Sequence, residues 1–256
     1  MLSVKEKIAY GLGDTASNII FQTVMMFLLL YYTDVVGLSP AIVGTLFLVV
    51  RIFDAVTDPL MGALADRTHT RWGQFRPYLL WLAIPFGLIS VLAFSKFELN
   101  DNGKIIYAFV SYTLLMIAYT AINIPYSALG GVLTNNPKER VSVQSYRFVF
   151  GMLGGLIVAS GTMPLVNWLG KGDQALGYQY AITVMSLFGV ILFLLCFWGT
   201  KERVTPPTAQ QSSLFKDLKV LWQNDQWRIL SIAGLLLLSG QVLRGTLAVY
   251  YVKYYL

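Results

Sequence analysis

Three charged side chains stand close together in a stretch that is otherwise apolar. The segment RIFDAVTDPLMGALADR at 51–67 places Arg51, Asp54 and Asp58 three and four residues apart, so a helix presents them on one face. A charge at the centre of a bilayer costs at least ~2.5–3.5 kcal/mol, and ionisable residues inside a membrane helix therefore point to a function.

Arg51 can neutralise only one of the two carboxylates in this stretch. The other one needs a proton or a metal cation when it is buried. The oxygen atoms of Asp54, Asp58 and the adjacent Thr57 suit Na⁺ or Li⁺, whereas a carboxylate alone suits H⁺. A simpler interpretation is a self-neutralising ion pair on a helix that packs inward, but it leaves one carboxylate unexplained.

Further polar residues recur at a similar depth in other apolar segments. Asn and Gln in a membrane helix often link one helix to another. Several amides, hydroxyls and an Arg that converge also form a pocket for a ligand with many hydroxyl groups. Helices interrupted near the midplane are typical of transporter sites, and Pro59 and Pro125 lie near these groups. The polar residues are Asp14, Ser17, Asn18, Tyr119, Thr120, Asn123, Gln144 and Arg147.

Composition decides the class of protein that must position these residues. The chain has 256 residues, of which 56% are hydrophobic and 12% charged, with a mean hydropathy of +0.60. A soluble domain has about 25% charged residues, so the composition predicts an all-α protein that crosses the membrane many times. The single Cys196 excludes a disulfide framework within the chain. The net charge of +6 is explained by membrane topology and predicts no nucleic-acid partner.

Seven apolar segments are long enough to be predicted as membrane helices. With the N-terminus in the cytoplasm, the connecting segments place twelve Lys and Arg residues inside and three (Lys96, Lys104 and Lys171) outside. This asymmetry follows the positive-inside rule. We expect a six-helix bundle at 1–200, a cytoplasmic central loop at 201–228 and a seventh helix at 229–256. The predicted spans are 10–33, 40–64, 77–97, 105–130, 142–167, 178–199 and 229–254.

Longer motifs give the chain a family resemblance. The run YYTDVVGLSPAIVGTLFLVVRIFDAVTDPLMGALADRTHTRWGQFRP resembles the glycoside–pentoside–hexuronide:cation symporters, the melibiose permease family, a branch of the major facilitator superfamily. The stretches YGLGD at 10–14, INIPYSALGGVLTNNPKER and QNDQW are similar to the same family. The resemblance implies secondary active sugar:cation symport by alternating access. It also implies a complete fold of twelve helices in two six-helix bundles around a cavity of sugar size.

The resemblance implies a role for several residues. Asp54 and Asp58 match the family's cation-binding carboxylates, Thr120 matches a cation ligand, and Thr57 replaces an Asn at that site. Arg147 matches an Arg of the sugar site, whereas Asn18 and Asn123 stand where the melibiose permease has Asp. We place Tyr119 in the same substrate site. These changes suit a pentoside or a uronide, whose carboxylate Arg147 or Arg244 could meet, and the identity of the sugar stays open.

The loop RTHTRWGQFRP after GALADR resembles the superfamily's motif between helices two and three. There Asp66 can pair with Arg71 and Arg76 and hold the inner gate closed, and Arg51 adds a structural ion pair on the helix before the loop. We expect the only histidine, His69, to be solvated in this loop.

Two other functions compete with symport. GLGD at 11–14 has the GxGD pattern of intramembrane aspartyl proteases, with Asp54 or Asp58 as a partner for Asp14. That motif is short, and the seven-helix resemblance does not fit a protease. The other alternative is a non-transporting regulatory or remnant protein. We expect no enzyme activity, no cofactor besides the coupling Na⁺ or H⁺, and a location in the inner membrane of a bacterium.

A family member would be about twice as long, which indicates a truncated form that lacks its C-terminal bundle as a partner. Alternating access needs two bundles that move around a central site. We therefore predict that these 256 residues alone do not catalyse coupled transport. The chain is reconstituted into liposomes with a Na⁺ or H⁺ gradient, and sugar accumulation is measured. Gradient-driven accumulation would contradict the prediction and would mean that the chain works as an oligomer.

Overall fold

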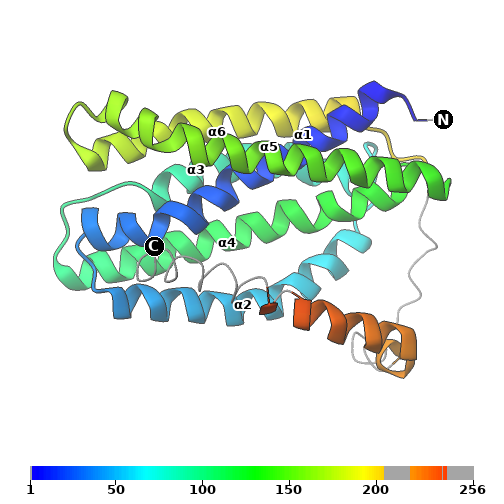
Figure 1. Cartoon of the computed structure of the whole chain (residues 1–256), viewed down its shortest axis with the longest axis horizontal. Coiled ribbons are helices and arrows are strands. Elements are labelled where there is room, and N and C mark those ends of the chain that lie inside the picture. Colours follow the sequence, from blue (N-terminus) through cyan, green and yellow to red (C-terminus); the bar gives the residue numbers. More distant parts are fainter. Residues whose placement is uncertain (1, 205–219, 238, 241–256) are drawn as a thin grey trace, which may run out of the picture. The chain divides into compact units, whose positions relative to one another are not determined.

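The computed structural model describes residues 2–204, 220–237 and 239–240. The chain divides into two compact units, Met1–Pro206 and Pro207–Leu256. The first unit is built from helices alone among its described residues (Figure 1). These are α1 (Val4–Thr23), the π-helical turns η1 (Val24–Leu28) and η2 (Tyr31–Val35), α2 (Pro40–Asp66), α3 (Arg76–Ala93), α4 (Asp101–Val132), α5 (Pro137–Gly170) and α6 (Gln174–Gly199).

Each of the first six predicted spans corresponds to one helical region, and the boundaries follow capping residues that apolar runs do not mark. Ser3 accepts a hydrogen bond from the Glu6 N–H at 3.2 Å, so α1 begins at Val4 and not at residue 10. Asn136 caps α5 in the same way by accepting from the Lys138 N–H at 2.9 Å. Such caps satisfy backbone donors that the first turn of a helix leaves unpaired.

Five of the described helices, α2 to α6, are long and apolar enough to cross a membrane. The helix α1 contains Lys5, Glu6, Lys7 and Asp14 within its 20 residues and is not among these five. Large apolar side chains such as Ile52 and Val56 on α2 and Phe148 and Met152 on α5 are exposed, as expected where helices face lipid. The described fold is that of an all-α membrane protein.

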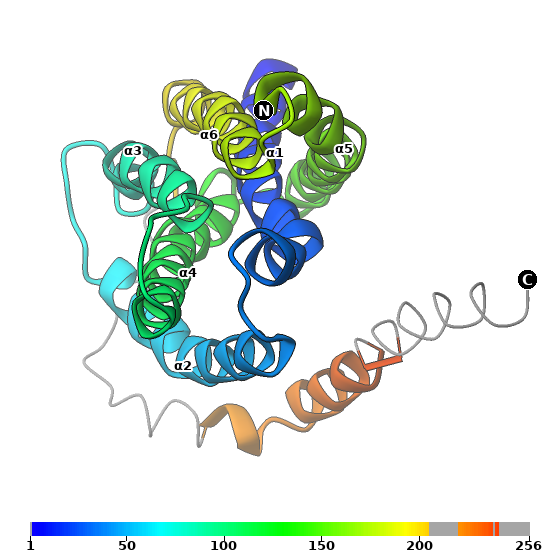
Figure 2. The ribbon, with the colours of Figure 1, turned by 90° about the vertical axis from the view of Figure 1, so that its left-hand side faces the viewer.

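The six helices of the first unit pack in a definite order (Figure 2). The helix α1 lies against α5 and α6, α3 lies against α4 and α6, and α2 packs mainly on α4. Gly13 allows the close approach of α1 to α4, because a Cβ atom there would lie 2.5 Å from the Tyr126 ring. This arrangement brings the polar residues of α1, α4 and α5 to one region.

The segment that follows α6 ties the ends of several helices together. The carboxylate of Glu202 accepts hydrogen bonds from the backbone N–H groups of Gln74, Phe75 and Arg76 at 2.8–2.9 Å, at the start of α3. Arg203 donates to both carboxylate oxygens of Glu6 on α1, at 2.5 and 2.9 Å, and this bonding raises the pKa of the Arg203 guanidinium.

The second unit contains the start of the predicted seventh span. Residues 220–223 and 225–237 are helical, and the Asn224 side chain accepts from the Trp227 N–H at 3.1 Å. The rest of the predicted helix, including Arg244 and residues 241–256, lies outside the described residues, as does 205–219 of the predicted central loop. The domain boundaries at 200 and 228 stay predictions.

We predict that Glu202→Ala lowers the free energy of unfolding by about 0.5–2 kcal/mol, the usual range for a lost helix cap. The physical reason is that three backbone donors at the start of α3 lose their acceptor. The measurement is the midpoint of thermal unfolding in detergent. Glu98→Ala at an exposed position is the control, and equal midpoints for the two variants would contradict the prediction.

Candidate functional site

Among the described residues, Arg51 on α2 pairs with Asp54 and not with Asp58. Arg51 Nη1 lies 3.4 Å from Asp54 Oδ2, as expected for residues three apart on one helix. Arg51 Nη2 also contacts Met25 Sδ at 3.6 Å on the π-helical turn η1. Asp54 is 8% exposed, and its Oδ1 has no hydrogen-bond partner among the described residues. One buried carboxylate oxygen is therefore left without a protein donor.

Asp58 is joined to α4. Thr120 donates a hydrogen bond to Asp58 Oδ1 at 2.8 Å, and Thr120 is itself buried. Thr57, in contrast, donates to the backbone oxygens of Phe53 and Asp54 at 3.2 and 3.3 Å. Thr57 and Thr120 both line a pocket of about 210 Å³ between α2 and α4. Two carboxylates and a hydroxyl thus come from two adjacent helices.

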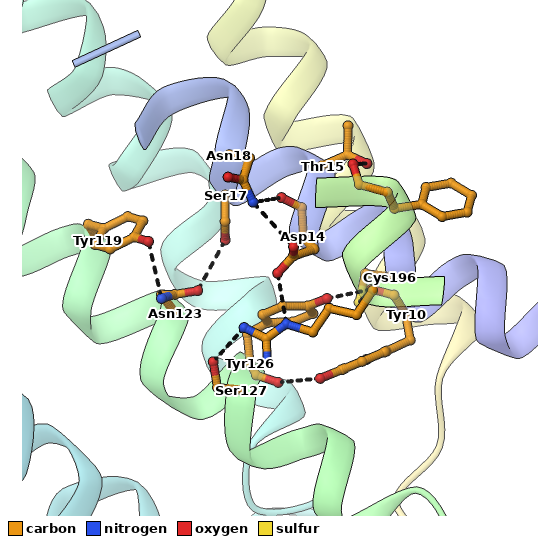
Figure 3. Close-up of polar contacts among 12 residues, drawn as sticks. Tyr10, Asp14, Thr15, Ser17, Asn18, Tyr119, Asn123, Tyr126, Ser127 and Cys196 are labelled. Atoms are coloured by element: carbon orange, nitrogen blue, oxygen red, sulfur yellow. Dashed lines mark hydrogen bonds and ion pairs between the residues drawn. The ribbon is translucent and has the colours of Figure 1, made fainter. Parts of the chain in front are cut away.

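A second cluster of polar side chains lies between α1 and α4 (Figure 3). Ser17 donates to Asn123 Oδ1 at 3.5 Å, and Asn123 Nδ2 donates to the Tyr119 hydroxyl at 3.2 Å. Asn18 is half-buried one position further along α1 but donates to the Asp14 backbone oxygen at 3.0 Å and to Asp14 Oδ2 at 3.2 Å. The structure therefore brings Tyr119 and Asn123 into direct contact and links Asn18 to a different partner.

That partner, Asp14, also binds Arg147 of α5. Arg147 Nε lies 2.9 Å from Asp14 Oδ1, and Arg147 Nη2 donates to Ser127 Oγ at 3.1 Å. The guanidinium carbon of Arg147 lies 5.3 Å from the centre of the Tyr126 ring, within cation–π range. Residues of α1, α4 and α5 thus surround one guanidinium.

The polar cluster of α2 and α4 adjoins the cluster between α1 and α4. Tyr119 and Thr120 are neighbours on α4, and the Tyr119 ring stacks on Phe21 with 5.2 Å between centroids. Arg51 in turn lies 6.0 Å from the centre of the Phe21 ring. Contacts therefore run from the carboxylates of α2 to the amide of Asn123 without a break.

The predicted ion pairs of the loop between α2 and α3 do not form in this structure. Among the described residues, Asp66 makes no salt bridge with Arg71 or Arg76, and its carbonyl accepts from Gln74 Nε2 at 2.9 Å. Arg76 donates to the carbonyl oxygens of Trp72 and Phe197 at 3.2 and 2.6 Å. Arg71 lies over the Trp72 ring at 4.3 Å. The carboxylate that holds this loop is Glu202.

The sequence does not identify two important partners. It places Asp14 among the polar residues of the apolar segments but does not assign it to Arg147, although a carboxylate and an Arg in two different membrane helices are expected to pair. Glu202 is also not indicated, because a carboxylate that follows a membrane span has no spacing signal that identifies its distant acceptor role. The only free cysteine in the chain, Cys196, is buried and donates weakly to the Tyr10 carbonyl at 3.9 Å.

Long apolar helices that enclose carboxylates, amides and an Arg define a multi-pass membrane protein with an internal polar site. Sequence comparison then gives the family. Residues 9–256 match the family model described as MFS/sugar transport protein, where MFS is the major facilitator superfamily. The chain belongs to this family, as the resemblance to glycoside–pentoside–hexuronide:cation symporters predicted. It is a family of transporters and not of enzymes, which rules out the intramembrane protease.

Several bacterial relatives are similar along almost the whole chain. The inner membrane symporter YicJ of Escherichia coli is 50% identical over 100% of this chain and 55% of its own length. The putative glycoside/cation symporter YagG of E. coli is 51% identical over 99% of this chain and 55% of its own. An isoprimeverose transporter of Lactiplantibacillus pentosus is 39% identical over 99% of this chain and 54% of its own. The chain spans about half the length of these relatives.

Proposed function

We propose that this chain forms the cation- and sugar-binding half of a sugar:cation symporter that works by alternating access. Two neighbouring features of α2 and α4 carry the proposal. Thr120 of α4 donates a hydrogen bond to Asp58 of α2, and Asp54 on the same helix as Asp58 has a buried oxygen without a partner among the described residues. A buried carboxylate oxygen without a donor is satisfied by a proton or a small cation. The adjoining amides and Arg147 offer donors and acceptors to a sugar.

The coupling cation is proposed to bind at Asp54 and Asp58, with Thr120 assisting. Thr57 is a weaker candidate, because its hydroxyl proton is used by the backbone oxygens of its own helix, although its oxygen can still accept or coordinate. Carboxylate and hydroxyl oxygens suit Na⁺, and two carboxylates near each other also suit a shared H⁺. Arg51 compensates one of the two charges on Asp54 and Asp58, which leaves a net negative charge for the cation.

The sugar is proposed to contact Asn18, Tyr119, Asn123 and Arg147. These side chains come from α1, α4 and α5, and they are linked by hydrogen bonds within two neighbouring clusters. The names of the relatives support a glycoside as the substrate class. A uronide remains within the same proposal, since an Arg is present in the site.

We place the protein in the inner membrane, as the name of the relative YicJ supports, with the N-terminus in the cytoplasm as the distribution of Lys and Arg predicts. A second bundle facing α1, α2, α4 and α5 would complete the cavity and alternate its access to the two sides.

We predict that Asp58→Cys in the complete transporter abolishes the stimulation of sugar uptake by the cation. Thr120→Ala is expected to weaken the apparent cation affinity by about tenfold, as for the loss of one hydrogen bond to a charged group. Thr113→Ala on the same helix is the matched control. The measurement is sugar uptake at increasing Na⁺ and at several pH values. Normal cation stimulation in both Asp54→Cys and Asp58→Cys would refute the cation site.

We also predict that Asn123→Ala weakens sugar binding while cation affinity changes only by the reciprocal coupling between the two sites. The reason is that Asn123 loses its contacts with Ser17 and Tyr119 as well as its donors for the sugar. Binding is measured with a panel of pentosides, hexosides and uronides, and Asn102→Ala at the exposed start of α4 is the control. Unchanged binding in Asn18, Asn123 and Arg147 variants would place the sugar elsewhere.

A further inference from the structure

We infer that Asp14 is the positioning residue that holds Arg147 ready for the sugar, and that Gly151 provides the space this requires. The inference rests on the proposed function, because it concerns recognition in the proposed sugar site. Asp14 acts through Arg147 and Asn18.

Both carboxylate oxygens of Asp14 are used. Oδ1 accepts from Arg147 Nε at 2.9 Å, and Oδ2 accepts from Asn18 Nδ2 at 3.2 Å. Asp14 is 8% exposed, so these bonds form away from solvent and hold their partners firmly. Asp14 thereby orients Asn18 on its own helix (Figure 3) and Arg147 on α5, both of which are proposed sugar ligands.

Arg147 is fixed from three sides. Asp14 holds Nε, Ser127 accepts from Nη2 at 3.1 Å, and the Tyr126 ring lies against the guanidinium. Tyr126 is itself held, since its hydroxyl donates to the Tyr10 carbonyl at 2.8 Å and its ring stacks on Tyr10. Among the described residues Nη1 forms no hydrogen bond, and it is not among the buried unpartnered atoms. Its two N–H groups are therefore available as donors to a sugar hydroxyl.

The position of the Asp14 carboxylate depends on a glycine opposite Oδ2, the oxygen that bonds Asn18. A Cβ atom at Gly151 would clash with Asp14 Oδ2 and would lie 3.2 Å from Asn18 Nδ2. At Gly154, one turn away, a Cβ atom would lie 2.9 Å from the Thr15 carbonyl, so α1 and α5 are in close contact here. Gly155 differs, because a Cβ atom there would meet only Gln22 at 3.8 Å, an ordinary contact.

The charge of the pair has a consequence for specificity. Asp14 compensates the positive charge of Arg147, and the other side chains of the site, such as Asn18, Asn123 and Ser127, are neutral. Asp14→Asn keeps the size of the side chain but leaves the guanidinium without its counterion. An acidic sugar would then gain an attraction that a neutral sugar of the same shape does not have.

The test measures binding to the complete transporter with p-nitrophenyl glycosides of glucose, galactose, xylose and glucuronic acid. In Asp14→Asn we expect neutral glycosides to bind about ten- to hundredfold more weakly, because the amide has one acceptor oxygen where the carboxylate uses two, and one hydrogen bond to a charged group is lost. The affinity for the glucuronide, divided by the affinity for the neutral glycosides, should rise by about tenfold or more. Gly151→Ala should weaken all probes that the wild type binds, and Gly155→Ala should change none.

The outcomes separate this inference from the proposed function. Wild-type affinity in Asp14→Asn, or an equal loss for neutral and acidic probes, would overturn the positioning role. Equal effects of Gly151→Ala and Gly155→Ala would overturn the role of Gly151. If the wild type binds none of the probes, the proposed function fails and the inference falls with it. Retained cation stimulation in Asp14→Asn, together with the shifted ratio, would support the inference.

Discussion

A carboxylate among membrane helices has to find a partner, and this constraint organises the described structure. Water is absent from the bilayer core, so an ionised side chain is stable there only beside a counterion or several donors. Asp14 meets the requirement fully, with Arg147 on one oxygen and Asn18 on the other. Asp54 meets it on one oxygen only, through Arg51. Asp14, whose two oxygens are both bonded, therefore suits the positioning of other side chains, whereas Asp54, with one oxygen unbonded, is a candidate for cation binding.

The two clusters of polar side chains are neighbours because α4 contributes residues to both. Thr120 faces Asp58 of α2, while Tyr119 and Asn123 face α1. Stacking of Phe21 on Tyr119 closes the remaining gap toward Arg51. In a symporter the cation and the sugar must influence each other's binding equally, and such coupling is transmitted by packed side chains that connect the sites. The geometry of α4 supplies that connection in the proposed mechanism.

The ends of the helices show the same principle outside the apolar region. Backbone N–H groups at the start of α3 need acceptors, and Glu202 supplies them from a segment more than 120 residues later. The aligned peptide dipoles of α3 favour a negative charge at this end. Asp66, which the loop motif suggested as an ion-pair partner, is exposed and uses its backbone carbonyl instead. Backbone donors at the start of α3 and the Glu202 carboxylate therefore hold this loop, and Asp66 forms no ion pair with Arg71 or Arg76 among the described residues.

The sequence by itself determined the membrane class, the approximate spans of α1 to α6 and the family, because hydrophobicity and helical spacing act over a few residues. It also indicated that Arg51 neutralises only one carboxylate of α2, and the structure shows that this is Asp54. The family resemblance indicated Asp58 and Thr120 as two ligands of one cation site, and the direct hydrogen bond between them at 2.8 Å appears only in the structure. Only the tertiary structure decided that Arg147 pairs with Asp14, 133 residues away, and that Glu202 caps α3. Such partners depend on which helix faces pack together and on where a glycine such as Gly151 allows close approach, and no local pattern encodes that choice.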